Sequence, residues 1–388
     1  MLFIRTRNLF KEFFDSEKAG GLILIICTIL SLVIANSSIG EAYLHFWHQH
    51  LDLSFLNIKL DYSAEEWVND GLMAIFFLLV GLEIERELYV GELSVFKNAL
   101  LPILAAFGGM LVPALIHLGF NHDLPTRSGM GIPMATDIAF ALGVLSLAGN
   151  RVPASVKVFL TAVAIIDDLG AVMIIAVFYT KSLSLFYLCL SLGIFVLMLA
   201  FNKLKLRNLF FYIIPGIVMW YFMLKSGVHA TISGVLLAFA IPFDKKGIHP
   251  SAIVQHFLHK PVAYVLLPIF ALANTGILLS NDWYRSLESH NSLGIIAGLF
   301  IGKPLGIALI CFAALKMKIC GFPEQMGWKH LSGICVLAGI GFTMSIFIAN
   351  LAFDNPDLIR DSKIAILTAS LLAGLVGFIL LTRIPRKL

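Results

Sequence analysis

Residues 162–175 read AVAIIDDLGAVMII, an apolar run interrupted at its centre by the neighbouring carboxylates Asp167 and Asp168. The wider run, 158–179, has the length of about 20 residues that a helix needs to cross the ~30 Å hydrocarbon core of a bilayer. A charge at that depth costs at least ~2.5–3.5 kcal/mol, so it normally faces a cavity or a partner. The stretch therefore predicts a membrane-spanning helix whose acidic pair serves a function.

The composition extends this interpretation to the whole 388-residue chain. Hydrophobic residues make up 59% and charged residues only 13%, about half of the ~25% that soluble domains carry. These values exclude a water-soluble enzyme, a disordered chain and a secreted disulfide scaffold. The net charge of +4 comes without a basic patch interleaved with aromatic residues, so we expect no nucleic-acid partner. The five cysteines lie in or beside apolar runs, which is typical of buried apolar side chains.

Apolar runs of spanning length recur along the chain and predict an all-α polytopic membrane protein, one integral domain over 1–388. They are 18–36, 67–89, 97–120, 129–148, 158–179, 183–201, 258–279, 293–315, 330–353 and 364–382. The stretch 209–242 would measure about 50 Å as a single helix, which is too long for a simple crossing. We therefore expect two shorter helices there, broken near Lys225–His229, and twelve transmembrane helices in total.

The basic residues predict the orientation of these helices. With the N-terminus in the cytoplasm and alternating sides, most Lys and Arg residues fall on the cytoplasmic side, as the positive-inside rule requires. The outer side then holds Lys59, Arg127, Lys181, Lys225, Arg285, Arg360 and Lys363. A single helix over 209–242 would place the basic clusters 203–207 and 245–246 on opposite sides. The rule therefore favours two helices and places both termini in the cytoplasm.

Two further ionisable residues fall at the centres of predicted spans, Asp137 in 129–148 and Lys303 in 293–315. A buried ion pair between Lys303 and one aspartate is the structural alternative, but it leaves two carboxylates over. Hard cations need oxygen ligands, and a nearby like charge together with burial favours protonation of a carboxylate. Because neighbours on a helix point ~100° apart, Asp167 and Asp168 face different directions. A site that binds either a cation or protons is suited to an exchanger.

Backbone breaks lie close to these charges. Gly131 and Pro133 precede Thr136–Asp137, and Gly339 and Gly341 lie at the centre of 330–353. Proline removes a helix donor and glycine eases unwinding, although each could also be an ordinary kink or a small-residue helix contact.

Each break lies in the middle helix of a three-helix group, 97–179 or 293–382, and the two groups start on opposite sides of the membrane. This arrangement predicts inverted-topology repeats with discontinuous helices 4 and 11 crossing at the midplane, as in secondary transporters. Half-helix ends carry about half a charge each, so Asp137 could compensate facing N-termini and Lys303 facing C-termini.

The longest loop, 37–66, contains HLDLSFLNIKLD at 50–61, which alternates apolar and polar residues. A period of two is typical of a strand or hairpin, and an irregular outer loop is the alternative. A small hairpin exposed on the periplasmic side could pair with another subunit. The remaining helices would form an interface panel beside the two repeats.

Several long motifs together resemble the bacterial NhaA-type sodium/proton antiporters, over about residues 12–384. They are WVNDGLMAIFFLLVGLEIERELYVGEL, IPMATDIAFALGVL, AIIDDLGAV, SGVHATISGVLLAFAIP, IGKPLGIAL and GIGFTMSIFIANLAF. The resemblance implies that Asp168 with Asp167 forms the cation- and proton-binding pair, and that Lys303 neutralises the site and pairs with Asp167 when it is empty. Asp137 and Thr136 match the extended segment of the fourth helix and are expected to belong to the cation- and proton-binding residues as well, and Gly341 matches the break in the eleventh.

The resemblance also implies a pH response. The cytoplasmic positions linked to pH control are matched by Glu83, Arg86, His256 and His259, and His229 matches a histidine near the outer end of the eighth helix. Gln255 departs from the usual acidic residue and leaves the pH profile open. From spacing alone, Glu83 with Arg86 could be a surface ion pair, and the two cytoplasmic histidines could simply be solvated.

The resemblance therefore implies an electrogenic, pH-regulated antiporter of the bacterial inner membrane, which exchanges cytoplasmic Na⁺ or Li⁺ for external H⁺. We expect a homodimer in the lipid bilayer, no cofactor and no enzymatic activity. A sodium-coupled symporter of an organic anion and an intramembrane aspartyl protease are the alternatives. The second would need two aspartates converging from different helices. The histidines of HFWHQH, 45–50, lack a further ligand set, so we expect no resident metal there.

Overall fold

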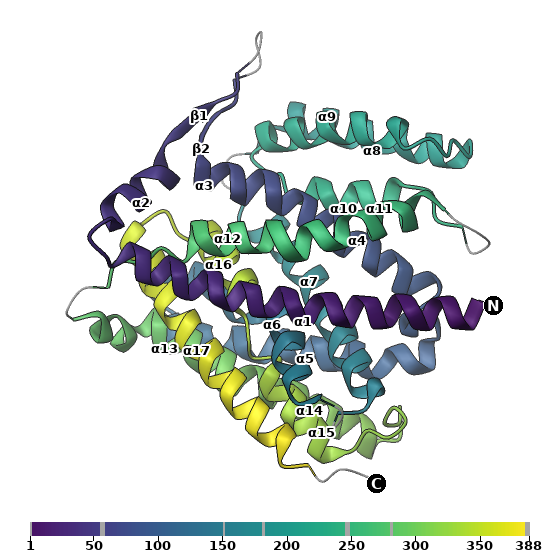
Figure 1. The fold of residues 1–388 in the computed structure, drawn as a ribbon, viewed down its shortest axis with the longest axis vertical. Coiled ribbons are helices and arrows are strands. Elements are labelled where there is room, and N and C mark those ends of the chain that lie inside the picture. Colours follow the sequence, from purple (N-terminus) through teal and green to yellow (C-terminus); the bar gives the residue numbers. More distant parts are fainter. Residues whose placement is uncertain are drawn as a thin grey trace. The chain divides into compact units, whose positions relative to one another are not determined.

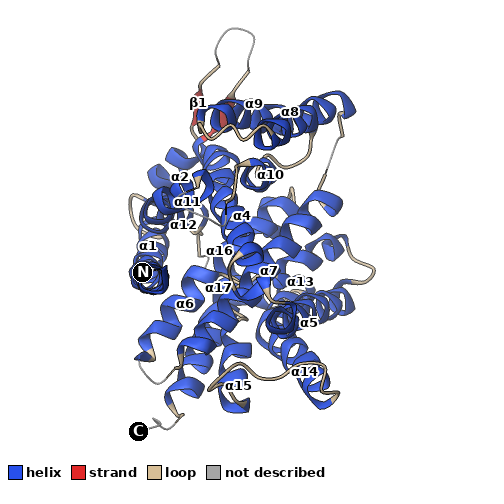
Figure 2. Ribbon diagram, turned by 90° about the vertical axis from the view of Figure 1, so that its right-hand side faces the viewer, coloured by secondary structure: helices blue, strands red, loops and turns tan. Residues whose placement is uncertain are grey.

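The computed structural model describes residues 2–54, 59–149, 152–180, 183–244, 249–279 and 282–384, without the side chains of residues 2–18 and Glu92. The regular structure of the described residues is helix apart from two short strands, and loops and turns join these elements (Figure 2). Lys181, Lys245, Lys246 and residues 55–58 of the alternating stretch lie outside the described residues. The chain is thus a mostly helical protein, as its composition predicts.

Seven helical stretches within the described ranges are long and apolar enough to cross a bilayer, and three bent helix pairs raise the number to as many as ten. The seven are Ala64–Tyr89, Phe96–Asn121, Ala154–Phe178, Leu185–Lys203, Pro250–Asn274, His290–Lys316 and Pro356–Thr382. The bent pairs are Ala19–Ala35 with Gly40–His48, Pro125–Met134 with Ile138–Leu147, and Trp328–Leu337 with Phe342–Ala352. These lengths and compositions define a multi-pass membrane protein.

The chain groups into two compact units. Unit 1 comprises Met1–Ile25, Glu87–Ile175 and Ser280–Leu388, and so contains almost all of both segments predicted as repeats. Its helical elements are the first part of α1 (Leu2–Ala35), η2 (Glu92–Ser94), α5 (Phe96–Asn121), η3 (Pro125–Met134), α6 (Ile138–Leu147), most of α7 (Ala154–Phe178), η6 (Trp283–Glu288), α13 (His290–Ile296), η7 (Ala297–Gly302), α14 (Lys303–Lys316), α15 (Trp328–Leu337), α16 (Phe342–Ala352) and α17 (Pro356–Thr382).

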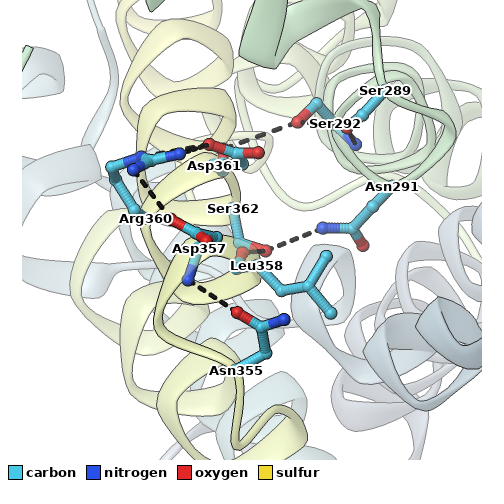
Figure 3. A network of polar contacts seen from close by, with 9 residues as sticks. All are labelled: Ser289, Asn291, Ser292, Asn355, Asp357, Leu358, Arg360, Asp361 and Ser362. Carbon is cyan, nitrogen blue, oxygen red and sulfur yellow. Dashed lines mark hydrogen bonds and ion pairs between the residues drawn. The ribbon is translucent and has the colours of Figure 1, made fainter. Parts of the chain in front are cut away.

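Polar side chains join the first turn of α13 to the second turn of α17 within unit 1. Asn291 Nδ2 donates to Ser362 Oγ at 2.8 Å, and Ser292 Oγ donates to the Asp361 carbonyl oxygen at 3.5 Å (Figure 3). Asn355 caps α17 by accepting the Asp357 amide at 2.9 Å. These bonds fix the start of the last helix against the helix that leads to Lys303.

Unit 2 comprises Ile26–Arg86 and Ala176–Leu279. Its elements are the rest of α1, α2 (Gly40–His48), β1 (His50–Asp52), β2 (Asp61–Ser63), α3 (Ala64–Glu66), η1 (Trp67–Leu72), most of α4 (Met73–Tyr89), α8 (Leu185–Lys203), α9 (Phe210–Ser226), α10 (Ile232–Ala240), α11 (Pro250–Pro261), η5 (Val262–Leu266) and α12 (Leu267–Asn274). The two strands lie side by side (Figure 1). They pair antiparallel, with Leu51 opposite Tyr62. The alternating stretch thus forms a hairpin at its base.

The ambiguous stretch 209–242 contains two helices. α9 ends at Ser226, and Gly227 follows in the left-handed conformation at φ +83°, which glycine adopts without a steric cost. α10 begins at Ile232 after a turn that contains His229. α8 and α9 lie side by side, joined by a hydrogen bond of 3.1 Å from Ser191 Oγ to the Met219 carbonyl oxygen (Figure 1). The stretch thus contains the two helices that the basic residues favour, with the break at the expected position near Lys225–His229.

Candidate functional site: carboxylates and a lysine at two helix breaks

Two interrupted helices meet at their breaks inside unit 1. η3 and α6 are bent by 44° across residues 135–137, and α15 and α16 by 42° across residues 338–341. The Asp137 amide donates to the Ile340 carbonyl oxygen at 2.7 Å, so backbone groups freed by one break bond to the other. An opened backbone inside a membrane is tolerated only when such partners exist.

The sequence accounts for both breaks. Pro133 lies in η3, a tight helix, and Ala135 after it is extended at φ −88° and ψ 151°. At the second break a Cβ on Gly339 would lie 2.5 Å from the Leu299 carbonyl oxygen of η7. A side chain at that position would therefore push η7 away from the break, and glycine is needed for this close approach.

Asp137 lies between the N-termini of two helices. It caps α6, with Oδ1 accepting the Phe140 amide at 2.8 Å. Its Oδ2 accepts the Thr343 amide of α16 at 3.0 Å and the Thr343 hydroxyl at 2.5 Å. The side chain is buried. A carboxylate is favoured at a helix N-terminus because exposed amides and the helix dipole attract negative charge, and Asp137 meets two such ends.

Lys303 lies at a helix C-terminus and beside an aspartate. Its Nζ donates to the Met134 carbonyl oxygen, the last of η3, at 2.6 Å and lies 2.9 Å from Asp167 Oδ2. Both charged side chains are 0% exposed. A buried ion pair is tolerated only when its members are also hydrogen-bonded, and here the lysine donates to a backbone carbonyl as well.

Thr136 connects the aspartate pair to the second break. Its hydroxyl lies 2.9 Å from Asp167 Oδ2 and 2.9 Å from the carbonyl oxygen of Ala338, which ends α15. The single hydroxyl proton is shared between these two acceptors. The extended segment after η3 thus places one polar side chain between the acidic pair and a free helix end.

Asp167 and Asp168 are both buried on α7, and Asp168 lies within electrostatic range of the Lys303 ammonium group. Asp167 Oδ2 accepts from Lys303 and Thr136, whereas Oδ1 has no hydrogen-bond partner among the described residues. Carboxylate oxygens, the Thr136 hydroxyl and nearby backbone carbonyls form an oxygen-rich donor set. That set can bind either a hard cation or protons.

The helix segment before Lys303 has π-helical geometry. η7, Ala297–Gly302, ends directly at Lys303, and π-helical segments inside α-helices often accompany functional sites. A Cβ on Gly298 would lie 2.7 Å from Pro133, and one on Gly302 would lie 3.0 Å from the Pro113 Cα. Close packing against α5 and η3 therefore brings the lysine to the C-terminus of η3.

The predicted pH-response residues of unit 2 fall at two places. Glu83 of α4 is buried, and its Oε1 lies 3.9 Å from Nδ1 of half-buried His259 on α11. Half-buried Arg86 lies on the next turn of α4, and His256 is exposed on α11. His229 lies apart from them, in the turn between α9 and α10. Its Nε2 lies 3.2 Å from the Tyr179 carbonyl oxygen.

The helix that carries His256 and His259 begins earlier than the apolar run 258–279 predicts. α11 begins at Pro250, well before the expected 258, because His249 caps it and proline occupies its first position. His256 and His259 therefore belong to the second half of α11.

Sequence reasoning missed several polar groups around the breaks. Thr343 binds Asp137, Ser345 Oγ donates to the Ile132 carbonyl oxygen at 2.6 Å, and Ser370 Oγ accepts the Phe342 amide at 3.2 Å. Buried Glu85 accepts a hydrogen bond from Ser251. The signal for Thr343 was available, since it is a hydroxyl two residues after Gly341 in an apolar run.

No group of three or more His, Cys, Asp or Glu side chains among the described residues is arranged to hold a metal ion. Within HFWHQH, His50 Nδ1 lies 3.0 Å from Asp61 Oδ1 across the hairpin, and His48 Nε2 lies 3.7 Å from Glu65 Oε2. These histidines thus make separate ion-pair contacts.

The fold and the site define a multi-pass helical membrane protein with ionisable groups buried at two helix breaks. The sequence profile of the family described as Na⁺/H⁺ antiporter 1 matches residues 11–381. A protein named Na⁺/H⁺ antiporter NhaA from Flavobacterium psychrophilum is 57% identical over 376 residues, which cover 97% of this chain and 96% of the relative. Its namesake from Dechloromonas aromatica is 58% identical over 378 residues, covering 96% and 95%, and that from Citrobacter koseri 48% over 372 residues, covering 95% and 96%. This chain belongs to the Na⁺/H⁺ antiporter 1 family.

Proposed function

We propose that this protein is a secondary transporter that exchanges cytoplasmic Na⁺ or Li⁺ for external H⁺. Family membership and the printed names of the relatives support the transported ions. The observation that carries the proposal is the buried group of Asp167, Asp168 and Lys303 beside two facing helix breaks. An unpaired charge inside a membrane has a high free-energy cost, so the charges of such a site need a bound partner. The helix segments on either side of the two breaks can rearrange around that partner.

The exchange follows from competition at one set of oxygens. When Na⁺ is bound at Asp168 and Asp167, it provides the positive charge beside Asp167. When the site holds no cation, Lys303 provides that charge. Protons entering from the opposite side neutralise the carboxylates and release the cation. If both aspartates, or one aspartate and Lys303, carry protons for each cation, the cycle moves net charge and is electrogenic.

The membrane arrangement completes the proposal. Twelve spans, with 97–179 and 293–382 as inverted repeats, would place the two breaks at the midplane with both termini in the cytoplasm of a bacterial inner membrane. The hairpin of β1 and β2 would face outward and pair with a second subunit, because its strands leave unpaired edges. The family resemblance and the cluster of Glu83 and His259 support pH regulation.

The experiment that tests this function uses Asp168→Asn in proteoliposomes with an imposed pH gradient. We expect wild-type protein to drive Na⁺ and Li⁺ movement against the proton gradient and Asp168→Asn to abolish it, because the amide cannot exchange a proton for a cation. Asp123→Asn, a change of an exposed aspartate, is the matched control and should transport normally. The variant must elute and melt like wild-type protein; undiminished exchange by folded Asp168→Asn would refute the assignment.

A further inference from the structure

The N-terminus of α11 is capped by a histidine. His249 Nδ1 accepts the amide of Ala252 at 3.2 Å, and His249 has the extended backbone of a cap residue at φ −111° and ψ 154°. Caps are usually Ser, Thr, Asp or Asn, whose side-chain oxygens remain acceptors over a wide pH range. An imidazole nitrogen accepts only while it is unprotonated. This cap therefore depends on pH in a way that the usual ones do not.

The histidine bond completes the first turn of α11. Pro250 has no amide, the Ser251 amide donates to the Pro242 carbonyl oxygen at 3.4 Å, and the Ile253 amide donates to the His249 carbonyl oxygen at 3.2 Å. Only the Ala252 amide relies on a side chain. Protonation at Nδ1 would leave this amide without its acceptor and would also put a positive charge at the positive end of the helix dipole.

We propose that His249 is a positioning residue for the pH response of transport: neutral His249 caps α11, and its protonation releases the first turn of the helix that carries His256 and His259. The inference rests on the proposed antiport function. It adds a residue and a mechanism that the sequence did not single out.

Charged groups meet this turn from three other segments. Asp244 precedes the turn in the chain and attracts a protonated His249. Arg207, between α8 and α9, has its Nη2 3.2 Å from Asp244 Oδ2. Glu85 of α4 accepts a hydrogen bond from Ser251. The Phe243 ring covers the imidazole at a centroid distance of 4.2 Å. We therefore expect the neutral imidazole of His249 to keep the hydrogen bond from the Ala252 amide and the protonated imidazole to move towards Asp244.

The direction of the effect follows from the same contacts. Burial lowers the pKa of His249 below its ordinary value, and Asp244 opposes this shift only partly. The cap is therefore complete above the ordinary pKa of about 6.5 and is lost as pH falls through the lower pKa of the folded protein. We expect α11 to loosen on the acidic side, and the exchange rate to fall there with it.

The test compares His249→Ser and His249→Asn, whose caps are indifferent to pH, with the uncapped His249→Ala. Hydrogen exchange of the 251–254 amides in the purified full-length protein, corrected for intrinsic rates, measures the protection that the cap provides. We expect wild-type protein to lose protection below about pH 6.5, His249→Ser and His249→Asn to keep it, and His249→Ala to lack it throughout. Protection in wild-type protein that does not change with pH overturns the proposal.

The rate of Na⁺/H⁺ exchange in vesicles measures the effect of the cap on transport. At the pH where half of the His249 rings are protonated, the serine variant should exceed the wild-type rate by about twofold, with equal rates at alkaline pH. Asp244→Asn should shift the wild-type acid limb to lower pH, and His122→Ser, an exposed histidine elsewhere, should leave it unchanged. Identical acid limbs for wild-type protein and His249→Ser overturn the regulatory role. If none of the proteins exchanges Na⁺ for H⁺ at any pH, the proposed antiport function is refuted instead. The hydrogen exchange of the amides does not depend on transport, so it still decides whether His249 caps α11.

Discussion

Asp137 and Asp167 are buried aspartates beside the same pair of helix breaks, yet their partners differ. Both oxygens of Asp137 accept hydrogen bonds, from the Phe140 amide and from the amide and hydroxyl of Thr343. Asp167 concentrates its contacts on Oδ2, which faces Lys303 and Thr136, whereas Oδ1 has no hydrogen-bond partner within the described chain.

This difference separates a fixed charge from an exchangeable one. Asp137 neutralises two helix N-termini with groups that stay in place, so any change in its charge would open the contact between the breaks. Asp167 relies chiefly on a lysine side chain with rotatable bonds, and it keeps an oxygen for another ligand. We therefore propose that Asp137 belongs to the scaffold of the site, in place of the ion-binding role expected from the sequence, and that Asp167, with Asp168, carries its ion chemistry.

The largest effect on stability is expected for Lys303→Ala, which leaves Asp167 buried without its cation. Breaking a buried pair on one side typically costs about 3–5 kcal/mol, and thermal unfolding in detergent would show the loss. Lys316→Ala, an exposed change at the end of the same helix, is the control.

The double variant Asp167→Asn with Lys303→Ala sharpens this test. It removes both charges, so it should recover part of the stability that Lys303→Ala loses. An unchanged melting temperature in the single variant, or a further loss in the double one, would contradict the pairing.

A smaller effect is expected for Asp137→Asn. The amide presents a donor on one side, so one set of donors, from either Phe140 or Thr343, loses its acceptor at a cost of about 1–3 kcal/mol. Thr343→Val removes one hydroxyl and keeps the backbone bond, so it should cost about 1 kcal/mol. If Thr343→Val proved the more damaging change in the same melting assay, Asp137 would not be the centre of this contact.

The smallest effect is expected for Thr136→Val, which keeps the shape of the side chain and removes its hydroxyl. Asp167 keeps Lys303, whereas the Ala338 carbonyl oxygen loses a partner, so we expect a loss of about 1 kcal/mol. Thr136→Ser should restore the wild-type melting temperature. A loss as large as that of Lys303→Ala would mean that the hydroxyl, and not the ammonium group, holds Asp167.

Much of the fold was predictable because apolar runs and breakers act locally. The lengths of the runs predicted spanning helices, the length of 209–242 and the basic clusters on either side of it predicted two helices there, and alternation predicted the hairpin base. The start of α11 was not predictable from hydropathy, because residues 250–257 are amphipathic and a histidine is an uncommon cap.

For the site, the rarity of charge in apolar runs was enough to single out Asp137, Asp167, Asp168 and Lys303. The hydrogen-bond partners of these four residues could not be predicted in the same way. Met134 and Ala338 contribute backbone carbonyls, which every residue carries, and only the folded chain shows which are left open by a break. The placement of the charges left the partner of Lys303 open, the family resemblance implied Asp167, and the geometry shows that pair.

The central claim is that one set of carboxylates holds either the cation or protons. The most direct measurement is the proton release when Na⁺ is added to purified protein in weakly buffered detergent, between about pH 6 and 9. We predict that each Na⁺ bound releases protons, with K⁺ as the control cation, and that Asp168→Asn abolishes both binding and release. Na⁺ binding to the wild-type protein without proton release at any pH in this range would contradict the claim.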